Sequence, residues 1–302
     1  MCGIVGLHLR DPDLEPRLGD LLTTMLGEMT DRGSDSAGVA VYGNPDWTPA
    51  GSATVTVLAD GVDALTLASR VGTHLGCEVR GRELGATVLL SAGTGTGTGP
   101  EALASAVRAA VPEAVLVGLG SELAVLKGVG LPLDLAAGFG LPGASGWQGV
   151  GHTRMATESA VTPAGSHPFS VGPDQCIVHN GSFSNHASVR RELARRDIHC
   201  DTLNDTEVAA RFVAAQIALG AGIDQALAEM AGVLDGFYTL LVSTAEEFAV
   251  FRDPIACKPA VIAETDRYVA MASEYRAMAH LPGIDEAHLY EPEPGRVYHW
   301  HR

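Results

Sequence analysis

The chain has 302 residues, of which 46% are apolar and 19% are charged, and its formal charge is −16. This composition supplies a substantial core and excludes a disordered chain, while the excess of acidic residues disfavours binding to nucleic acid. The sequence has no apolar run long enough to span a membrane and no export leader. We therefore expect a soluble, cytoplasmic protein that makes no membrane contact.

The cysteines lie far apart in the sequence and never form a CxxC pair. This spacing argues against a disulfide framework and against a zinc or iron–sulfur site. We therefore expect no metal and no cofactor on this chain. The cysteines are Cys2, Cys77, Cys176, Cys200 and Cys257.

The N-terminal segment from Met1 to Gly6 contains the first candidate for catalysis. Removal of Met1, which is usual before a small second residue, leaves Cys2 with a thiol and a free α-amine. An α-amine titrates near pH 7.7–8.0, so roughly a tenth or more of it is neutral at pH 7 and can accept the thiol proton. Cys2 is then a nucleophile with its own general base, although a cysteine can also occupy position 2 by chance.

The first half of the chain alternates strand and helix patterns. A strand over about 4–9, an amphipathic helix over about 14–30 and a polar loop over 31–38 lead into a strand over 39–42. From Gly43 to about Gly149 the order β-α-β, then α-β-β, predicts a small α+β insertion. Its expected strands cover 55–58, 86–92, 114–119 and 123–126, and its expected helices cover 61–75 and 100–111.

Reactive residue types concentrate after residue 150. Asn180-Gly181 could donate a side-chain amide and an unobstructed backbone N–H to an oxyanion, although Asn-Gly is also the commonest type I′ turn. Arg154 could bind a carboxylate through two hydrogen bonds, or form a surface ion pair. Asp205 could bind an ammonium group, or cap the helix that begins there.

The remaining elements are predicted from the same patterns. The expected helices cover a short stretch around 189–193, then 205–219, 224–234 and 274–280. The expected strands cover 176–179, 237–243, 248–252, 260–263 and 268–272, followed by two short strands at the end of the chain.

Nine segments, taken in this order, look like the class II glutamine amidotransferase domain. The resemblance covers roughly residues 2–43 and 150–300. The segments are Cys2-Gly3-Ile4-Val5-Gly6, Arg32-Gly33-Ser34-Asp35-Ser36-Ala37-Gly38, Gly151-His152-Thr153-Arg154, His167-Pro168, His179-Asn180-Gly181, Asp205-Thr206-Glu207, Asp235-Gly236-Phe237-Tyr238, Arg252-Asp253-Pro254 and Ala272-Ser273-Glu274.

The resemblance implies an α+β fold, the Ntn-hydrolase four-layer αββα sandwich. One domain would span residues 2–302, interrupted by the α+β insertion at about 44–149. The implied reaction is hydrolysis of the glutamine side-chain amide to glutamate and ammonia.

The resemblance also assigns roles to residues. Cys2 is the nucleophile, and Asn180 with Gly181 forms the oxyanion hole. Arg154 binds the α-carboxylate of L-glutamine, and Asp205 binds its α-ammonium group. Two further residues, Thr157 and His167, line the glutamine pocket. Met155 departs from the family pattern, which often has an aromatic residue there.

The chain ends where the glutaminase domain ends, with no synthase domain after it. In this and in its insertion it resembles the standalone amidotransferase subunit of glutamate-synthase-like complexes, including N-methylglutamate synthases. That resemblance implies a hetero-oligomer in which flavin-dependent partner subunits carry FMN, with an iron–sulfur cluster as a further candidate cofactor on those subunits. This chain would supply them with ammonia or glutamate.

Three other interpretations stay open. The chain could be a self-sufficient Ntn amidohydrolase that cleaves a γ-glutamyl or other small amide, or a non-catalytic binding module that kept the fold. His299 and His301 alternate on a terminal strand and share one face, as metal ligands can. Because no third ligand is near them in sequence, we expect a paired or unstructured tail there rather than a metal site.

Overall fold

The computed structural model describes residues 2–59, 61–155 and 161–302, and contains two packed antiparallel sheets. The seven-stranded sheet has the order β14-β12-β13-β1-β8-β2-β7, and the four-stranded sheet has the order β15-β11-β10-β9. The strands of the first are β1 (Gly3–Leu9), β2 (Ser36–Tyr42), β7 (Leu123–Val129), β8 (Gln148–Arg154), β12 (Val261–Glu264), β13 (Tyr268–Ala272) and β14 (His288–Tyr290). Those of the second are β9 (Cys176–Phe183), β10 (Gly236–Ser243), β11 (Glu247–Arg252) and β15 (Val297–His301).

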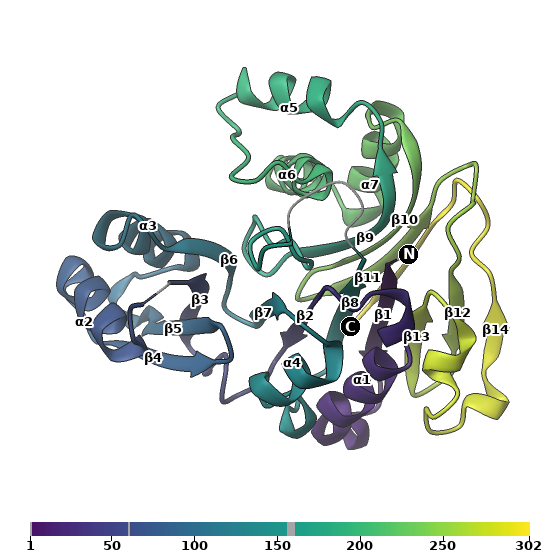
Figure 1. The fold of residues 1–302 in the computed structure, drawn as a ribbon, viewed down its shortest axis with the longest axis horizontal. Coiled ribbons are helices and arrows are strands. Elements are labelled where there is room, and N and C mark those ends of the chain that lie inside the picture. The colour runs from purple at the N-terminus through teal and green to yellow at the C-terminus, as the bar shows by residue number, and fades with distance from the viewer. Residues whose placement is uncertain (1, 60, 156–160) are drawn as a thin grey trace.

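Helices cover the outer face of each sheet (Figure 1). Helices α1 (Leu18–Gly27) and α4 (Pro132–Phe139) pack on the seven-stranded sheet. Helices α5 (His186–Ala194), α6 (Asp205–Ala218) and α7 (Ile223–Val233) pack on the four-stranded sheet. The arrangement is the predicted four-layer αββα sandwich. Within the described residues, no helix combines the length and the apolar character that crossing a membrane requires.

An apolar layer between the sheets holds them together. Ile4 of β1 lies in this layer with Val178 of β9 and Phe248 of β11. The alternate residues of β1, Val5 and Leu7, point the other way, into the core beneath α1. Both faces of β1 are therefore buried, which is why its sequence is a continuous apolar run rather than an alternating one.

A separate α+β unit lies to one side of the two main sheets (Figure 1). Its sheet has the order β4-β5-β3-β6, and helices α2 and α3 close a core of their own. The insertion expected at about 44–149 also takes in β7 and α4, which belong to the main sheet and its helix layer. The elements of the unit are β3 (Ser52–Leu58), α2 (Ala64–Leu75), β4 (Val79–Leu84), β5 (Thr87–Gly93), α3 (Pro100–Ala110) and β6 (Val115–Gly120).

The Asp174 carboxylate stabilises the junction between this unit and the main sheet. Asp174 accepts backbone N–H groups from Ser121, Glu122 and Leu123 at 2.8–3.0 Å. It adopts a φ of +52°, which an aspartate tolerates better than most residues. The β6–β7 connection is thereby fixed to the segment that leads into β9.

Three local predictions differ from the structure. Strand β4 was not predicted because half of its residues, with the sequence VRGREL, are charged and the strand lies at the edge of the sheet. Helix α4 was not predicted because only eight residues separate its flanking turns. The helix expected over 274–280 is a single 3₁₀ turn, Tyr275–Met278.

Candidate active site

Cys2 directly precedes β1, a central strand of the seven-stranded sheet. Its backbone carbonyl accepts a hydrogen bond from Nε of Arg32 at 3.0 Å. Arg32 is buried and pairs with Glu274 at 2.5 Å, and the hydrogen bond from Arg32 lowers the pKa of that carboxyl. The amide of Ile4 donates to Oγ of Ser273 at 2.9 Å. These contacts hold a half-buried Cys2 in one place.

Arg154 is the last residue of β8, the strand that runs antiparallel to β1. Because Thr153 lies opposite Gly3, the end of β8 and the start of β1 share one edge of the sheet. The Arg154 side chain is buried, so the alternative of a surface ion pair is wrong. A Cβ on Gly33 would lie 2.5 Å from the Arg154 carbonyl carbon, so the loop from Arg32 packs closely against this residue.

Asn180 and Gly181 lie inside β9, opposite Thr239 and Tyr238 of β10. The turn interpretation of this dipeptide is therefore wrong. Gly181 has a φ of +144°, and a Cβ there would lie 2.0 Å from the Phe237 carbonyl oxygen, so only glycine fits. The Asn180 side chain is buried, and its Nδ2 has no hydrogen-bond partner within the described structure. Leaving a buried donor without a partner costs free energy.

A hydrogen bond between the two sheets brings these strands together. His152 of β8 contacts the carbonyl oxygen of His179 of β9 through Nε2, at 3.0 Å. Arg154 lies two residues beyond His152, and Asn180 directly follows His179. The candidate carboxylate-binding residue and the candidate oxyanion donor are thus carried by directly linked strands.

His167 completes a buried cluster with these two histidines. Its ring stacks on His152 with the ring centroids 4.1 Å apart. Oγ1 of Thr206 contacts both His167 Nε2, at 2.8 Å, and His179 Nδ1, at 2.9 Å. The cluster therefore joins β8, β9 and the segment after residue 160 to the start of α6.

Burial lowers the pKa of each histidine in this cluster. The pKa of His152 falls to about 3, and that of His167 falls well below its usual value. Burial also lowers the pKa of His179, which the Asp205 carboxylate partly offsets. A general base works best with a pKa near the operating pH. These neutral, weakly basic rings are therefore poorly suited to act as a general base near pH 7.

Asp205 is the first residue of α6, but it does not cap the helix. Asn204 is the cap, since its Oδ1 accepts the Thr206 N–H at 2.8 Å, so the capping prediction for Asp205 is wrong. The Asp205 carboxylate instead accepts the N–H of Phe183 at 3.0 Å and lies 3.9 Å from His179. Its side chain remains 22% exposed, which suits a carboxylate that receives a charged group.

Comparison with known proteins decides the family. Residues 152–280 match the glutamine amidotransferase domain family. The chain is 49% identical to the glutamine amidotransferase-like protein GlxB of Rhizobium meliloti, over 99% of this chain and 98% of GlxB. The chain belongs to the glutamine amidotransferase family.

Two further matches cover only part of one or both proteins. A putative glutamine amidotransferase of Methanothermobacter thermautotrophicus is 34% identical over 51% of each chain. The structure of glutamine phosphoribosylpyrophosphate amidotransferase from B. subtilis matches 99% of this chain and 47% of that one, with a TM-score of 0.60 and 18% identity. This likeness confirms the predicted Ntn-hydrolase fold.

One predicted site residue lies outside the described part of the chain, and one buried lysine beside the site was not predicted. Thr157 lies outside the described residues. Lys127 of β7 is buried, and its Nζ donates to the carbonyl oxygens of Ala164, Ser166 and Pro168 at 2.9–3.2 Å. It holds the backbone on both sides of His167, and burial lowers its pKa to about 7. A single lysine within an otherwise apolar strand is the sequence feature that could have indicated this role.

Proposed function

We propose that this amidotransferase hydrolyses the side-chain amide of L-glutamine with Cys2 as the nucleophile. The observation that carries the proposal is the buried Nδ2 of Asn180, which has no partner among the described residues, next to Gly181, whose site admits no side chain. A tetrahedral oxyanion provides the acceptor that these two donors lack. Such preorganised donors are commonly a large contribution to amide hydrolysis.

The reaction proceeds by two transfers at the amide carbon. The α-amine of Cys2 accepts the thiol proton, and the thiolate forms a C–S bond while the carbonyl oxygen becomes an oxyanion. The protonated amine then returns a proton to the departing nitrogen, which leaves as ammonia. Water attacks the thioester, the C–S bond breaks, and glutamate is released with the thiol restored.

The substrate head group sets the other two roles. Arg154 binds the glutamine α-carboxylate, for which its planar guanidinium is suited. Asp205 binds the α-ammonium group, and the Phe183 amide holds its carboxylate in place. His167 and Thr157 line the pocket, and the hydrogen bond to Thr206 fixes the His167 ring.

The ammonia or glutamate passes, in this proposal, to flavin-dependent partner subunits of the N-methylglutamate synthase type. This chain carries no cofactor, and FMN and an iron–sulfur cluster belong to the partners. Exposed apolar side chains close in sequence to the site support a covering partner: Met155 is 41% exposed, Leu203 90% and Phe237 38%. The α+β insertion within the single 2–302 domain is a second candidate contact surface.

Ammonia release from glutamine tests the proposal, with γ-glutamyl amides as competing substrates. We expect glutamine to be the preferred substrate and expect turnover to rise when the partner subunits are added. A γ-glutamyl amide cleaved faster than glutamine by the isolated chain would instead favour a self-sufficient amidohydrolase. No cleavage of any amide, with or without partners, would contradict the proposal.

A further inference from the structure

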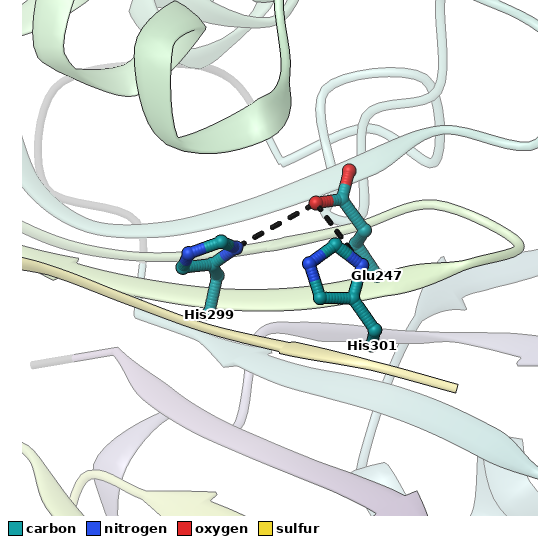
Figure 2. A group of neighbouring side chains, drawn as sticks. All are labelled: Glu247, His299 and His301. Atoms are coloured by element: carbon teal, nitrogen blue, oxygen red, sulfur yellow. Dashed lines mark ion pairs between the residues drawn. The ribbon is translucent and has the colours of Figure 1, made fainter.

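The C-terminal strand carries a second histidine cluster, outside the site described above. His299 and His301 of β15 face Glu247 of β11, as Figure 2 shows. Nδ1 of His299 lies 3.6 Å from Oε1 of Glu247, and Nδ1 of His301 lies 3.7 Å from the same oxygen. The three potential ligand atoms all lie within 4.8 Å of one another. The predicted paired tail is confirmed, since β15 pairs with β11, but Glu247 supplies a third potential ligand that is not near the histidines in sequence.

Strand pairing brings the third residue to the two histidines. His301 pairs directly with Glu247, and His299 pairs with Ala249, two residues further along β11. Glu247 and His301 are 54 positions apart in number (301 − 247), so sequence inspection cannot join them. The register places all three side chains on one face of the sheet.

The opposite face of β15 holds the two histidines in that orientation. Trp300, between them in sequence, points into the layer between the sheets and packs against Phe248 with the ring centroids 6.1 Å apart. Its Nε1 donates to Glu264 at 3.1 Å. Because side chains alternate along a strand, this anchor makes His299 and His301 point outward together.

We propose that Glu247, His299 and His301 form a binding site for a divalent cation of the Zn²⁺ class. Two imidazoles and one carboxylate are the donor set of zinc sites with an open position, and they suit Co²⁺ and Ni²⁺ as well. Zinc bonds of about 2.0–2.2 Å put tetrahedral ligands roughly 3.3–3.6 Å apart. The two imidazole nitrogens lie 3.6 and 3.7 Å from the Glu247 oxygen, and all three ligand atoms lie within 4.8 Å of one another, so the side chains would move closer together to bind the ion. Water completes the coordination.

The bound ion would join the edge strand β15 to β11. Strand β15 is at one edge of the four-stranded sheet and β9, with Asn180, is at the other. The cation therefore stabilises the C-terminal strand without entering the glutaminase chemistry. Any ligand that binds only the folded state raises the unfolding midpoint.

Cobalt titration of the Cys2→Ala chain tests this proposal. Cys2→Ala is used because it removes the N-terminal thiol, and a thiol binds soft and borderline metals itself. We expect one Co²⁺ per chain, with d–d absorption but no thiolate charge-transfer band, and displacement by Zn²⁺. Zinc should also raise the thermal unfolding midpoint of the same chain.

Single substitutions locate the ligands. Because loss of a partner that merely orients a ligand costs about 10–100-fold in affinity, His301→Ala and His299→Ala should each cost more than about 100-fold. Glu247→Gln should also weaken metal binding. That result would distinguish a site with three protein ligands from a site formed by the two histidines alone. The matched control is His280→Ala, since His280 forms an exposed pair with Glu28 at 3.8 Å but has no second histidine.

Two results would overturn the proposal. One is a chain that binds no Co²⁺ or Zn²⁺ at micromolar concentrations. The other is binding that His299→Ala, His301→Ala and Glu247→Gln leave unchanged, or that His280→Ala weakens as much as they do.

Discussion

The two main sheets and the β3–β6 unit each have a buried apolar core but make different use of it. Every proposed site residue within the described ranges lies on the main sheets or on the segments between them. The β3–β6 unit has its own core and contributes no such residue. Chemistry in this chain depends on long-range pairing between strands, whereas the unit is built from ordinary amphipathic elements. Substitutions in the two regions should therefore separate activity from stability.

The largest effect is expected at the oxyanion strand. Asn180→Ala should lower kcat by about 10²–10³-fold, since the lost donor acts on the charge that develops in the transition state. Stability should change little, because Nδ2 of Asn180 has no hydrogen-bond partner among the described residues. Steady-state glutaminase assays and urea unfolding measure both.

Asn185 supplies the control for that substitution. Its amide donates to the Val233 carbonyl oxygen at 2.8 Å and is structural. Asn185→Ala should lower stability and leave kcat within about twofold. An equal loss of kcat in both variants would contradict the role given to Asn180.

The next effect concerns substrate affinity. Asp205→Asn should raise KM for glutamine by about 10–100-fold, the worth of a hydrogen bond between charged groups, and change kcat less. The control is Asp253→Asn, because the Asp253 carboxylate is buried and accepts the N–H groups of Tyr238 and Ile255. Asp253→Asn should lower the free energy of unfolding without raising KM. A raised KM in Asp253→Asn together with an unchanged KM in Asp205→Asn would contradict the role given to Asp205.

The buried histidine cluster predicts acid sensitivity of the main sheets. The pKa of His152 is about 3 in the folded chain, against a usual value near 6.5, so the unfolded chain binds more protons between these pH values. Stability is fully present above pH 6.5 and falls as the pH falls toward 3. Between pH 7 and pH 5, protonation of this histidine alone lowers the free energy of unfolding by about 2 kcal/mol.

Urea unfolding at pH 7 and pH 5 measures that contribution. His152→Gln should be less stable at pH 7, because it disturbs the contact with His179. It should lose about 2 kcal/mol less than the wild type on acidification. Parallel losses in the two proteins would show that His152 does not carry the effect.

The smallest effect on activity is expected at the junction with the β3–β6 unit. Asp174→Ala removes the acceptor of three backbone N–H groups, which should cost about 1–3 kcal/mol of stability. Glutaminase activity at saturating glutamine should stay within about twofold. A large loss of kcat in a folded Asp174→Ala variant would show that substitutions in the two regions do not separate activity from stability.

The candidate nucleophile and the candidate substrate-binding residues could be proposed from the sequence because short segments carry them. Cys2 sits at the chain start, and Asn180-Gly181 and Asp205 each belong to a recognisable segment. The sequence could not choose between turn and oxyanion hole for Asn-Gly. The pairing of β9 with β10 puts the dipeptide within a strand and so excludes the turn.

The clusters were not predictable because their members meet only through tertiary structure. His152, His167 and His179 converge through a contact between sheets and through Thr206. Glu247 joins its histidines through the register of β11 with β15. Lys127 was missed for the same reason, since its carbonyl acceptors lie 37–41 residues away in the chain.

The central claim is that Cys2 attacks a glutamine side-chain carbonyl. The most direct test is the intact mass of the chain after incubation with 6-diazo-5-oxo-L-norleucine, with Cys2→Ala in parallel. The account predicts one adduct on a wild-type chain that lacks Met1, blocked by excess glutamine and absent from the variant. An adduct of equal yield on Cys2→Ala, or a wild-type chain that stays unmodified in the presence of its partner subunits, would contradict it.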